Sequence, residues 1–200
     1  MNEFPEVLRS VTGKRISAVR DALFALEPAH IGEQGAGYLV ALYTSSKQLD
    51  VRKQILRLLY DFDFPALDDF FALAYRKERY LDMKVYALRG LARRSEEGHL
   101  QRLLEGFRQT LTKRQQSTPY NYQEYELLRG RNALPYLVEC YGYACLRDTL
   151  EQVNRQYEAM PEAFKGHFTV DDNGTVVTLR EPGAGNALIR QFFDSKGVRD

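Results

Sequence analysis

Residues 49–59 read LDVRKQILRLL and residues 81–91 read LDMKVYALRGL, so one pattern of apolar, acidic and basic residues recurs after 32 positions. The matched pairs are Leu49/Leu81, Asp50/Asp82, Val51/Met83, Arg52/Lys84, Leu56/Leu88, Arg57/Arg89 and Leu59/Leu91. Within each copy the apolar residues fall three or four apart, which places them on one side of a helix. The two stretches therefore predict two equivalent amphipathic helices.

A second kind of helix alternates with these two. Pro65 suits the first turn of a helix, where its missing N–H costs nothing. The helix that it opens has the apolar stripe Leu67, Phe70, Phe71 and Ala74. A matching stripe follows at a shift of about 33 in residues 96–112, made of Leu100, Leu103, Leu104 and Phe107. Paired amphipathic helices with such a period are typical of a stacked helical solenoid, because one pair cannot cover its own apolar face.

Over residues 36–112, about two and a half units, the chain resembles HEAT-like and armadillo-type repeats. The residues that carry the resemblance are Pro65 at the start of one helix, Asp50/Asp82 with Arg52/Lys84 at the start of the other, and the ridge of Leu56/Leu88 and Leu59/Leu91. The pattern departs from the family where Ile55 is matched by the small Ala87. The resemblance implies that Asp50 and Asp82 cap their helices or tie neighbouring units together. It implies little about function, because such repeats bind proteins, peptides and nucleic acids alike.

The flanking sequence predicts further helices. We expect a helix over residues 14–27 that Pro28 ends, a loop at Gly32, Gly35 and Gly37, and a short helix over residues 38–43. Residues 113–119 form a polar linker, residues 120–143 hold six of the chain's 13 tyrosines with a break at Pro135, and residues 144–160 form a last long helix.

The C-terminal segment changes character. Two β-type runs, residues 167–170 and 175–179, flank Asp171-Asp172-Asn173-Gly174, and Asn-Gly is a strong hairpin signal. Gly185-Asn186 then opens a closing helix. We therefore expect an all-α protein, a short α-solenoid of stacked helical hairpins with a small C-terminal β-hairpin and helix as a cap. We expect one domain with four segments: residues 1–47, 48–112, 113–165 and 166–200.

Composition limits the classes of function. No apolar stretch approaches the roughly 20 residues of a membrane-spanning helix, and the first residues lack a signal-peptide pattern. We therefore expect a cytoplasmic protein whose two cysteines, Cys140 and Cys145, are reduced core thiols. Residues 51–116 hold 14 Lys/Arg against 9 Asp/Glu, whereas the rest holds 14 against 18. This basic middle favours an acidic partner but falls short of the footprint of a DNA-binding domain.

No recognisable catalytic motif is present. His30, His99 and His167 are far apart, and the acidic residues between Asp61 and Asp69 lack the glycine and distal glutamate of a calcium loop. Neither Gly32-x-x-Gly35-x-Gly37 nor Gly183-x-Gly185 has the spacing of a phosphate-binding loop. Neither cysteine has a nearby base in the sequence. We expect no catalytic residue, no metal and no cofactor.

Surface residues are therefore the candidate partner-binding groups. The repeat register predicts one ridge opposite the apolar stripes, made of Lys53, Arg57, Tyr60, Tyr86, Arg89 and Arg93. Arginine and tyrosine are enriched at binding hot spots. A second candidate is the tyrosine-rich segment, represented by Tyr120, Tyr122 and Tyr125. The alternatives are an ordinary solvated face for the ridge and a core aromatic layer beside the cap for the tyrosines.

These observations favour a protein-binding module, most simply a non-catalytic stoichiometric binder or inhibitor such as a bacterial toxin-immunity protein, with a toxin domain as its partner. One alternative is a nucleic-acid-binding repeat protein that uses a basic face. A second alternative is an enzyme with an unrecognised site.

Overall fold

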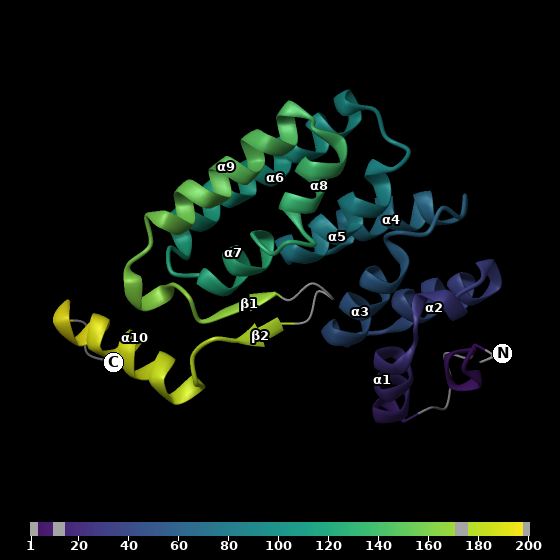
Figure 1. Ribbon diagram of the computed structural model, residues 1–200, viewed down its shortest axis with the longest axis horizontal. Helices are drawn as coiled ribbons and strands as arrows, with labels where there is room; N and C mark the ends of the chain where they lie inside the picture. The colour runs from purple at the N-terminus through teal and green to yellow at the C-terminus, as the bar shows by residue number, and fades with distance from the viewer. Residues whose placement is uncertain (1–3, 10–14, 171–175, 198–200) are drawn as a thin grey trace. The chain divides into compact units, whose positions relative to one another are not determined.

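The structure is a computed structural model that describes residues 4–9, 15–170 and 176–197 (Figure 1). Within these residues the chain forms ten α-helices and one two-stranded antiparallel sheet. The helices are α1 (Ile16–Ala25), α2 (Glu33–Ser45), α3 (Leu49–Leu59), α4 (Leu67–Lys77), α5 (Leu81–Ala92), α6 (Glu97–Ser117), α7 (Tyr122–Leu128), α8 (Leu134–Tyr141), α9 (Ala144–Glu158) and α10 (Pro182–Ser195). The strands are β1 (Phe168–Val170) and β2 (Val176–Thr178). The expected all-α class, with a small hairpin and a terminal helix, is confirmed.

The chain divides into two compact units that share helix α5. Unit 1 comprises Met1–Arg79 and Tyr86–Arg94, and unit 2 comprises Tyr80–Val85 and Ser95–Asp200. The first half of α5 therefore belongs to unit 2 and its second half to unit 1. The expectation of a single domain with four segments stays a prediction.

Unit 1 is built around α3, which packs against both α1 and α2. The apolar stripe expected from the sequence is buried, with Val51, Ile55 and Leu59 fully shielded from solvent. Asp50, in the first turn of α3, forms a 2.5 Å ion pair with Arg20 of α1. The carboxylate therefore ties two helices together at the start of α3.

The 32-residue register is confirmed by the helix boundaries, since α3 begins at Leu49 and α5 at Leu81. The match between the two helices fails at Leu58, whose equivalent in α5 is Gly90. At Gly90 of α5 an added Cβ would lie 2.4 Å from the ring of Phe71 in α4. A glycine is needed there because the aromatic ring occupies the place of a side chain.

Unit 2 is centred on α9, which packs against α6, α7 and α8 (Figure 1). Its core includes Leu104, Phe107 and Leu111 of α6 and Leu146 and Val153 of α9. Strand β1 packs on α7, and α10 packs on the short 3₁₀ helix Glu162–Phe164. The hairpin and closing helix are thus attached to the tyrosine-rich part of the chain.

Two buried carboxylates hold unit 2 together. Glu124 accepts hydrogen bonds from the backbone N–H of Leu81 (2.9 Å) and from Asn121 (3.1 Å), and it also pairs with Arg114. The contact to Leu81 places a negative charge at the N-terminus of α5, where the helix dipole favours it. The second carboxylate, Glu126, binds the start of the hairpin and is described with the candidate site.

Several predicted boundaries were wrong. Helix α6 continues to Ser117, through most of the expected polar linker, because residues 113–117 contain no helix breaker. Gly35 and Gly37 lie inside α2, and Gly35 is buried where an added Cβ would lie 2.8 Å from the Phe4 ring. Helix α10 begins at Pro182, three residues before Gly185.

The break expected at Pro135 is present, since this proline lies in the first turn of α8. Cys140 and Cys145 lie on α8 and α9, and only Cys145 is buried, so the expectation of two core thiols was wrong for Cys140. The expected hairpin turn Asp171-Asp172-Asn173-Gly174 lies outside the described residues. In the described ranges no helix is both long and apolar enough to cross a membrane.

Candidate partner-binding surfaces

The predicted basic ridge in unit 1 is in part an internal cluster. The Arg89 side chain is only 7% exposed, and its guanidinium group forms two hydrogen bonds of 2.8 and 2.6 Å to Asp61. It also lies 3.9 Å from the centroid of the Tyr60 ring, whose other neighbour is the buried Tyr86. Arg89 and Tyr86 therefore do not belong to an exposed contact surface. This burial corrects the expectation that both project opposite the apolar stripe.

The remaining ridge residues are partly accessible. Lys53, Arg57 and Tyr60 are half-buried, and Arg93 is exposed. Burial raises the pKa of the Tyr60 hydroxyl, while the nearby Arg89 charge opposes that shift. Tyr60 therefore remains a neutral phenol at physiological pH and serves mainly as the platform on which Arg89 stacks.

The tyrosine-rich segment in unit 2 is largely an aromatic layer. Tyr125 is 1% exposed, and its hydroxyl donates a 2.7 Å hydrogen bond to Gln156 of α9. Burial raises the pKa of Tyr125 to about 12. The Tyr122 ring is half-buried and lies 4.3 Å from the ring of His167. Tyr122 and Tyr125 both pack against other residues of unit 2. The burial of Tyr125 corrects the expectation that it is a contact residue.

Tyr120 is the most accessible of the three, with 37% of its surface exposed. Its ring stacks on Phe164 at a centroid distance of 4.5 Å and meets Phe192 and Phe193 of α10 edge-on. This aromatic cluster attaches α10 to the rest of unit 2. The alternative of a core aromatic layer beside the C-terminal helix therefore describes this segment better than an open binding surface.

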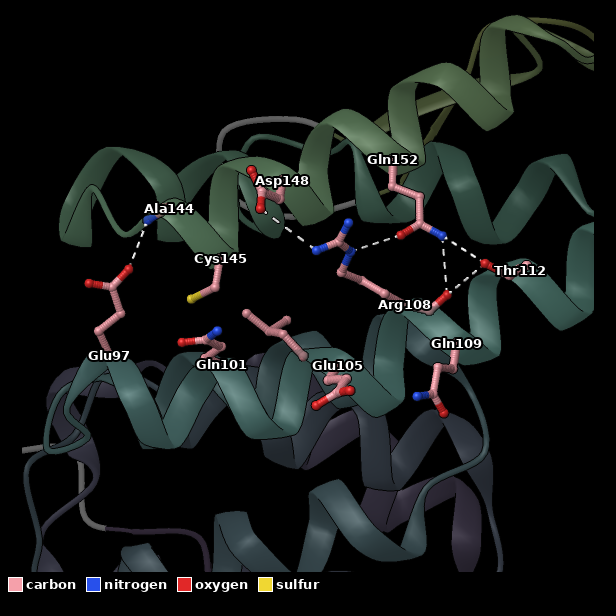
Figure 2. Close-up of a pocket in the computed structure, with 11 residues that line it drawn as sticks. Glu97, Gln101, Glu105, Arg108, Gln109, Thr112, Ala144, Cys145, Asp148 and Gln152 are labelled. Atoms are coloured by element: carbon pink, nitrogen blue, oxygen red, sulfur yellow. Dashed lines mark hydrogen bonds and ion pairs between the residues drawn. The ribbon is translucent and has the colours of Figure 1, made fainter.

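Sequence reasoning missed a polar groove between α6 and α9, with a volume of about 610 Å³ (Figure 2). Residues from both helices line it: Glu97, Gln101, Leu104, Glu105, Arg108, Gln109, Thr112, Ala144, Cys145, Asp148 and Gln152. Figure 2 shows Arg108 of α6 and Asp148 and Gln152 of α9 meeting between the two helices, whereas Gln109 projects from α6 away from α9. A second hollow continues past Arg108 to Gln115, Arg155 and Gln156. The two hollows follow most of the seam between the helices.

A hydrogen-bond network fixes the middle of this groove. The Arg108 Nε donates to the Gln152 side-chain oxygen at 3.0 Å, and the guanidinium lies 3.7 Å from Asp148. The Gln152 amide in turn donates to the Arg108 carbonyl and to the Thr112 hydroxyl, both at 3.1 Å. Arg108 is thus held in place before any ligand arrives, which reduces the entropy that binding would lose.

The end of the groove near Ala144 is acidic. Glu97 accepts a 2.9 Å hydrogen bond from the Ala144 N–H and so caps the start of α9. Glu105 lies about two turns further along α6 and is exposed. Cys145 forms part of the groove wall nearby. Burial, and then the Glu97 charge, raise the pKa of its thiol, so Cys145 is protonated at neutral pH and is a poor nucleophile.

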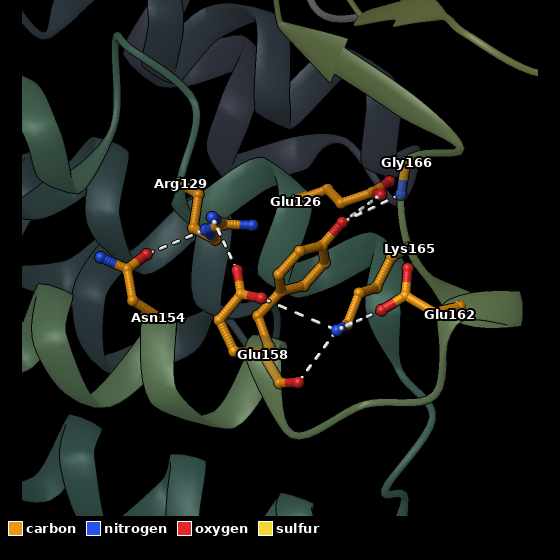
Figure 3. A network of polar contacts seen from close by, with 8 residues as sticks. Glu126, Arg129, Asn154, Glu158, Glu162, Lys165 and Gly166 are labelled. Carbon is orange, nitrogen blue, oxygen red and sulfur yellow. Dashed lines mark hydrogen bonds and ion pairs between the residues drawn. The ribbon is translucent and has the colours of Figure 1, made fainter.

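The C-terminal half of α9 carries a second network, centred on Tyr157 (Figure 3). Its hydroxyl donates to Glu126 (2.9 Å) and accepts from the Gly166 N–H (3.0 Å). The Arg129 guanidinium lies 4.1 Å from the ring centroid and donates to Asn154 at 2.9 Å. These contacts bind the loop before β1 to α7 and α9, so this network is structural.

Residues that could hold a metal do not gather within the described ranges, where no group of three His, Cys, Asp or Glu has suitable geometry. No family model, no curated protein and no solved structure matches the chain. The resemblance to HEAT-like repeats therefore stays a prediction, and the groove must be interpreted from its own chemistry.

Proposed function

We propose that this chain is a non-catalytic protein-binding helical module, and that the groove between α6 and α9 takes an extended segment of the partner. The observation that carries the proposal is the groove itself, whose polar lining comes from two helices and is partly held in place by the Arg108–Gln152 network. Its volume of about 610 Å³ is in the range of specific ligand sites. Its polarity makes it unsuited to the apolar face of an amphipathic helix.

An extended polypeptide fits the dimensions of the groove. Its α6 wall runs from Glu97 to Thr112, which at 1.5 Å per residue is about 22 Å. A strand rises about 3.3 Å per residue, so the wall would accompany roughly seven residues. Side-chain amides can both donate and accept, as a peptide backbone requires. Gln101 and Gln109 supply such amides on the α6 wall.

Charge gives the bound segment a direction. Glu97, Glu105 and the Asp148–Arg108 pair line the larger hollow, and Arg155 joins Arg108 in the next. A segment with a basic residue at the Ala144 end and an acidic residue towards Arg155 would complement this gradient. The partner segment is therefore expected to carry both charges, several residues apart.

Nucleic-acid binding is less well supported by the same observations. Three carboxylates and one arginine line the larger hollow, and this net negative charge would repel a phosphate backbone. In the basic middle of the sequence, five arginines form ion pairs with carboxylates: Arg52, Arg89, Arg94, Arg108 and Arg114. These positive charges are partly neutralised within the protein.

A small module that acts by occupying a partner suits a stoichiometric inhibitor, and a bacterial toxin-immunity protein is the class that we propose. Such a role needs a preorganised surface rather than a reactive group. We further propose that it acts in the cytoplasm, where Cys140 and Cys145 would remain the free thiols found in the structure.

The proposal is tested by capture from the native host with matched variants. Glu105 and Glu139 are both exposed helical glutamates, but only Glu105 lines the groove. Wild-type protein and Glu139→Arg should each retain the same polypeptide at one-to-one stoichiometry, whereas Glu105→Arg should weaken its binding at least about tenfold, a free-energy change of about 1.4 kcal/mol. Recovery of no partner at saturation, or equal affinity of Glu105→Arg, would contradict the proposal.

A further inference from the structure

The hairpin register decides which backbone N–H and C=O groups of strand β2 face β1 and which face outward. The register pairs Phe168 with Thr178, Thr169 with Val177, and Val170 with Val176. Beyond the strand, the Leu179 N–H donates to the His167 carbonyl at 2.9 Å, which places this pair at a hydrogen-bonded position of the ladder, although the His167 N–H donates to Glu126 and not back to Leu179. Bonded and non-bonded pairs alternate along an antiparallel ladder. The backbone groups of Val177 therefore face β1, and those of Val176 and Thr178 face outward.

The opposite edge of the hairpin supports this assignment. Phe168 is the non-bonded partner of Thr178, so its N–H should also face outward, and it donates to the Glu126 carboxylate at 3.2 Å. The edge of β1 is thus covered by a side chain from α7. Along β2, no described residue makes a hydrogen bond to the outward groups of Val176 or Thr178. These two residues present two donors and two acceptors.

The side chains of β2 lack the usual protection of an edge strand. All three residues are exposed, with Val176 at 49% and Val177 at 41%. Natural edges are commonly blocked by lysine, proline or a bulge, because an exposed uncharged edge pairs with another strand. The sequence Val-Val-Thr has no lysine, proline or bulge, and the length of only three residues is the one feature that limits pairing at this edge. The edge is therefore open to strand addition.

We propose that β2 pairs with β2 of a second copy of this chain across a two-fold axis at Val177. In that arrangement Val176 of one copy lies opposite Thr178 of the other, and the four outward groups of each strand form four intermolecular hydrogen bonds. Val177 lies opposite itself as a non-bonded pair, where Cα atoms approach to about 4.5 Å. The two hairpins become one four-stranded antiparallel sheet, β1–β2–β2–β1.

The strand itself identifies a second copy as the occupant. Its outward groups fall at the two residues that a two-fold axis at Val177 exchanges, so the strand is its own antiparallel complement. The pairing brings no like charges together, and it covers the exposed valine side chains. A closed isologous contact of this kind ends at a dimer, because it uses the free edge of each copy.

Charge exchange at Val177 tests the arrangement, because only this residue faces itself. Val177→Lys and Val177→Glu each place like charges directly opposite, which destabilises a cross-strand pair, whereas the mixture places opposite charges there. Weight-average mass is measured by sedimentation up to about 1 mM protein, a concentration that detects association with a Kd near 1 mM. The mass of the wild type should rise from the 23.1 kDa monomer towards twice that value.

Each charged variant alone should remain near monomer mass, and an equimolar mixture should regain the association of the wild type. The recovery of the mixture shows at once that both variants are folded. A wild type that stays monomeric throughout would overturn the proposal. So would a mixture that associates no better than its components, since association would then use another surface or register.

Discussion

Replacing Glu126 with alanine should release the β-hairpin while leaving the helices of unit 2 in place. The carboxylate accepts hydrogen bonds from the Tyr157 hydroxyl (2.9 Å), the His167 N–H (3.0 Å) and the Phe168 N–H (3.2 Å). Tyr157 keeps its contact with the Gly166 N–H and can turn towards solvent. The two backbone N–H groups lose their acceptor, and each buried unsatisfied group costs about 1–3 kcal/mol.

The expected loss of local stability is therefore about 2–6 kcal/mol. The readout is amide hydrogen exchange at Leu179, whose N–H bonds to the His167 carbonyl and so reports hairpin opening. A change of about 2 kcal/mol corresponds to roughly 25-fold faster exchange, while amides in the middle of α9 should change little. Glu126→Gln keeps one acceptor oxygen and should give an intermediate value. Unchanged exchange at Leu179 in Glu126→Ala would refute this account of the hairpin attachment.

Two glycines that differ in their surroundings should respond oppositely to alanine. Gly90→Ala should lower the free energy of unfolding by about 1–3 kcal/mol in chemical denaturation, because the new Cβ meets the Phe71 ring at 2.4 Å. Gly106→Ala, at an exposed position of α6 with nothing within 4 Å, should raise it by about 0.5–1 kcal/mol; equal effects would contradict the packing at Gly90. Tyr125 has a pKa of about 12 against 10.0 for a free phenol, so it stabilises the fold below pH 10 and loses that contribution as pH rises from 10 to 12. Tyr125→Phe should therefore be less stable at neutral pH, through loss of the Gln156 hydrogen bond, but show a shallower decline over that pH window; a parallel decline would argue against the raised pKa.

Local periodicity was enough to predict α3 and α5 and their register, but not the boundaries of α2, α6 and α10. The starts of α3 and α5 follow from leucines three or four apart, and the hairpin follows from short β-type runs. Burial was harder to predict where a polar residue meets a distant partner. The helical register predicts an outer position for Arg89, yet Tyr60 and Asp61 at the end of α3 enclose its side chain. Nothing in the spacing of Arg89 along α5 predicts that contact.

The groove could not be predicted from sequence because its walls are 44 residues apart, as the Arg108–Gln152 contact shows. A partial signal exists in α6. Glu97, Gln101, Glu105, Arg108 and Thr112 recur three or four apart beside the buried stripe of that helix. Such a polar stripe also fits an ordinary solvated face, and only the packing of α9 beside it turns the stripe into one wall of a groove.

Carboxyl footprinting of the complex with the captured partner tests the groove proposal most directly. Carbodiimide-coupled labelling of exposed carboxylates, read by mass spectrometry, compares Glu105 and Asp148 in the groove with Glu139 and Glu151 outside it; all four are exposed in the free protein. Partner binding should strongly reduce labelling of Glu105 and Asp148 and leave Glu139 and Glu151 unchanged. Full labelling of Glu105 and Asp148 in a saturated complex would show that the partner binds elsewhere and would contradict the account.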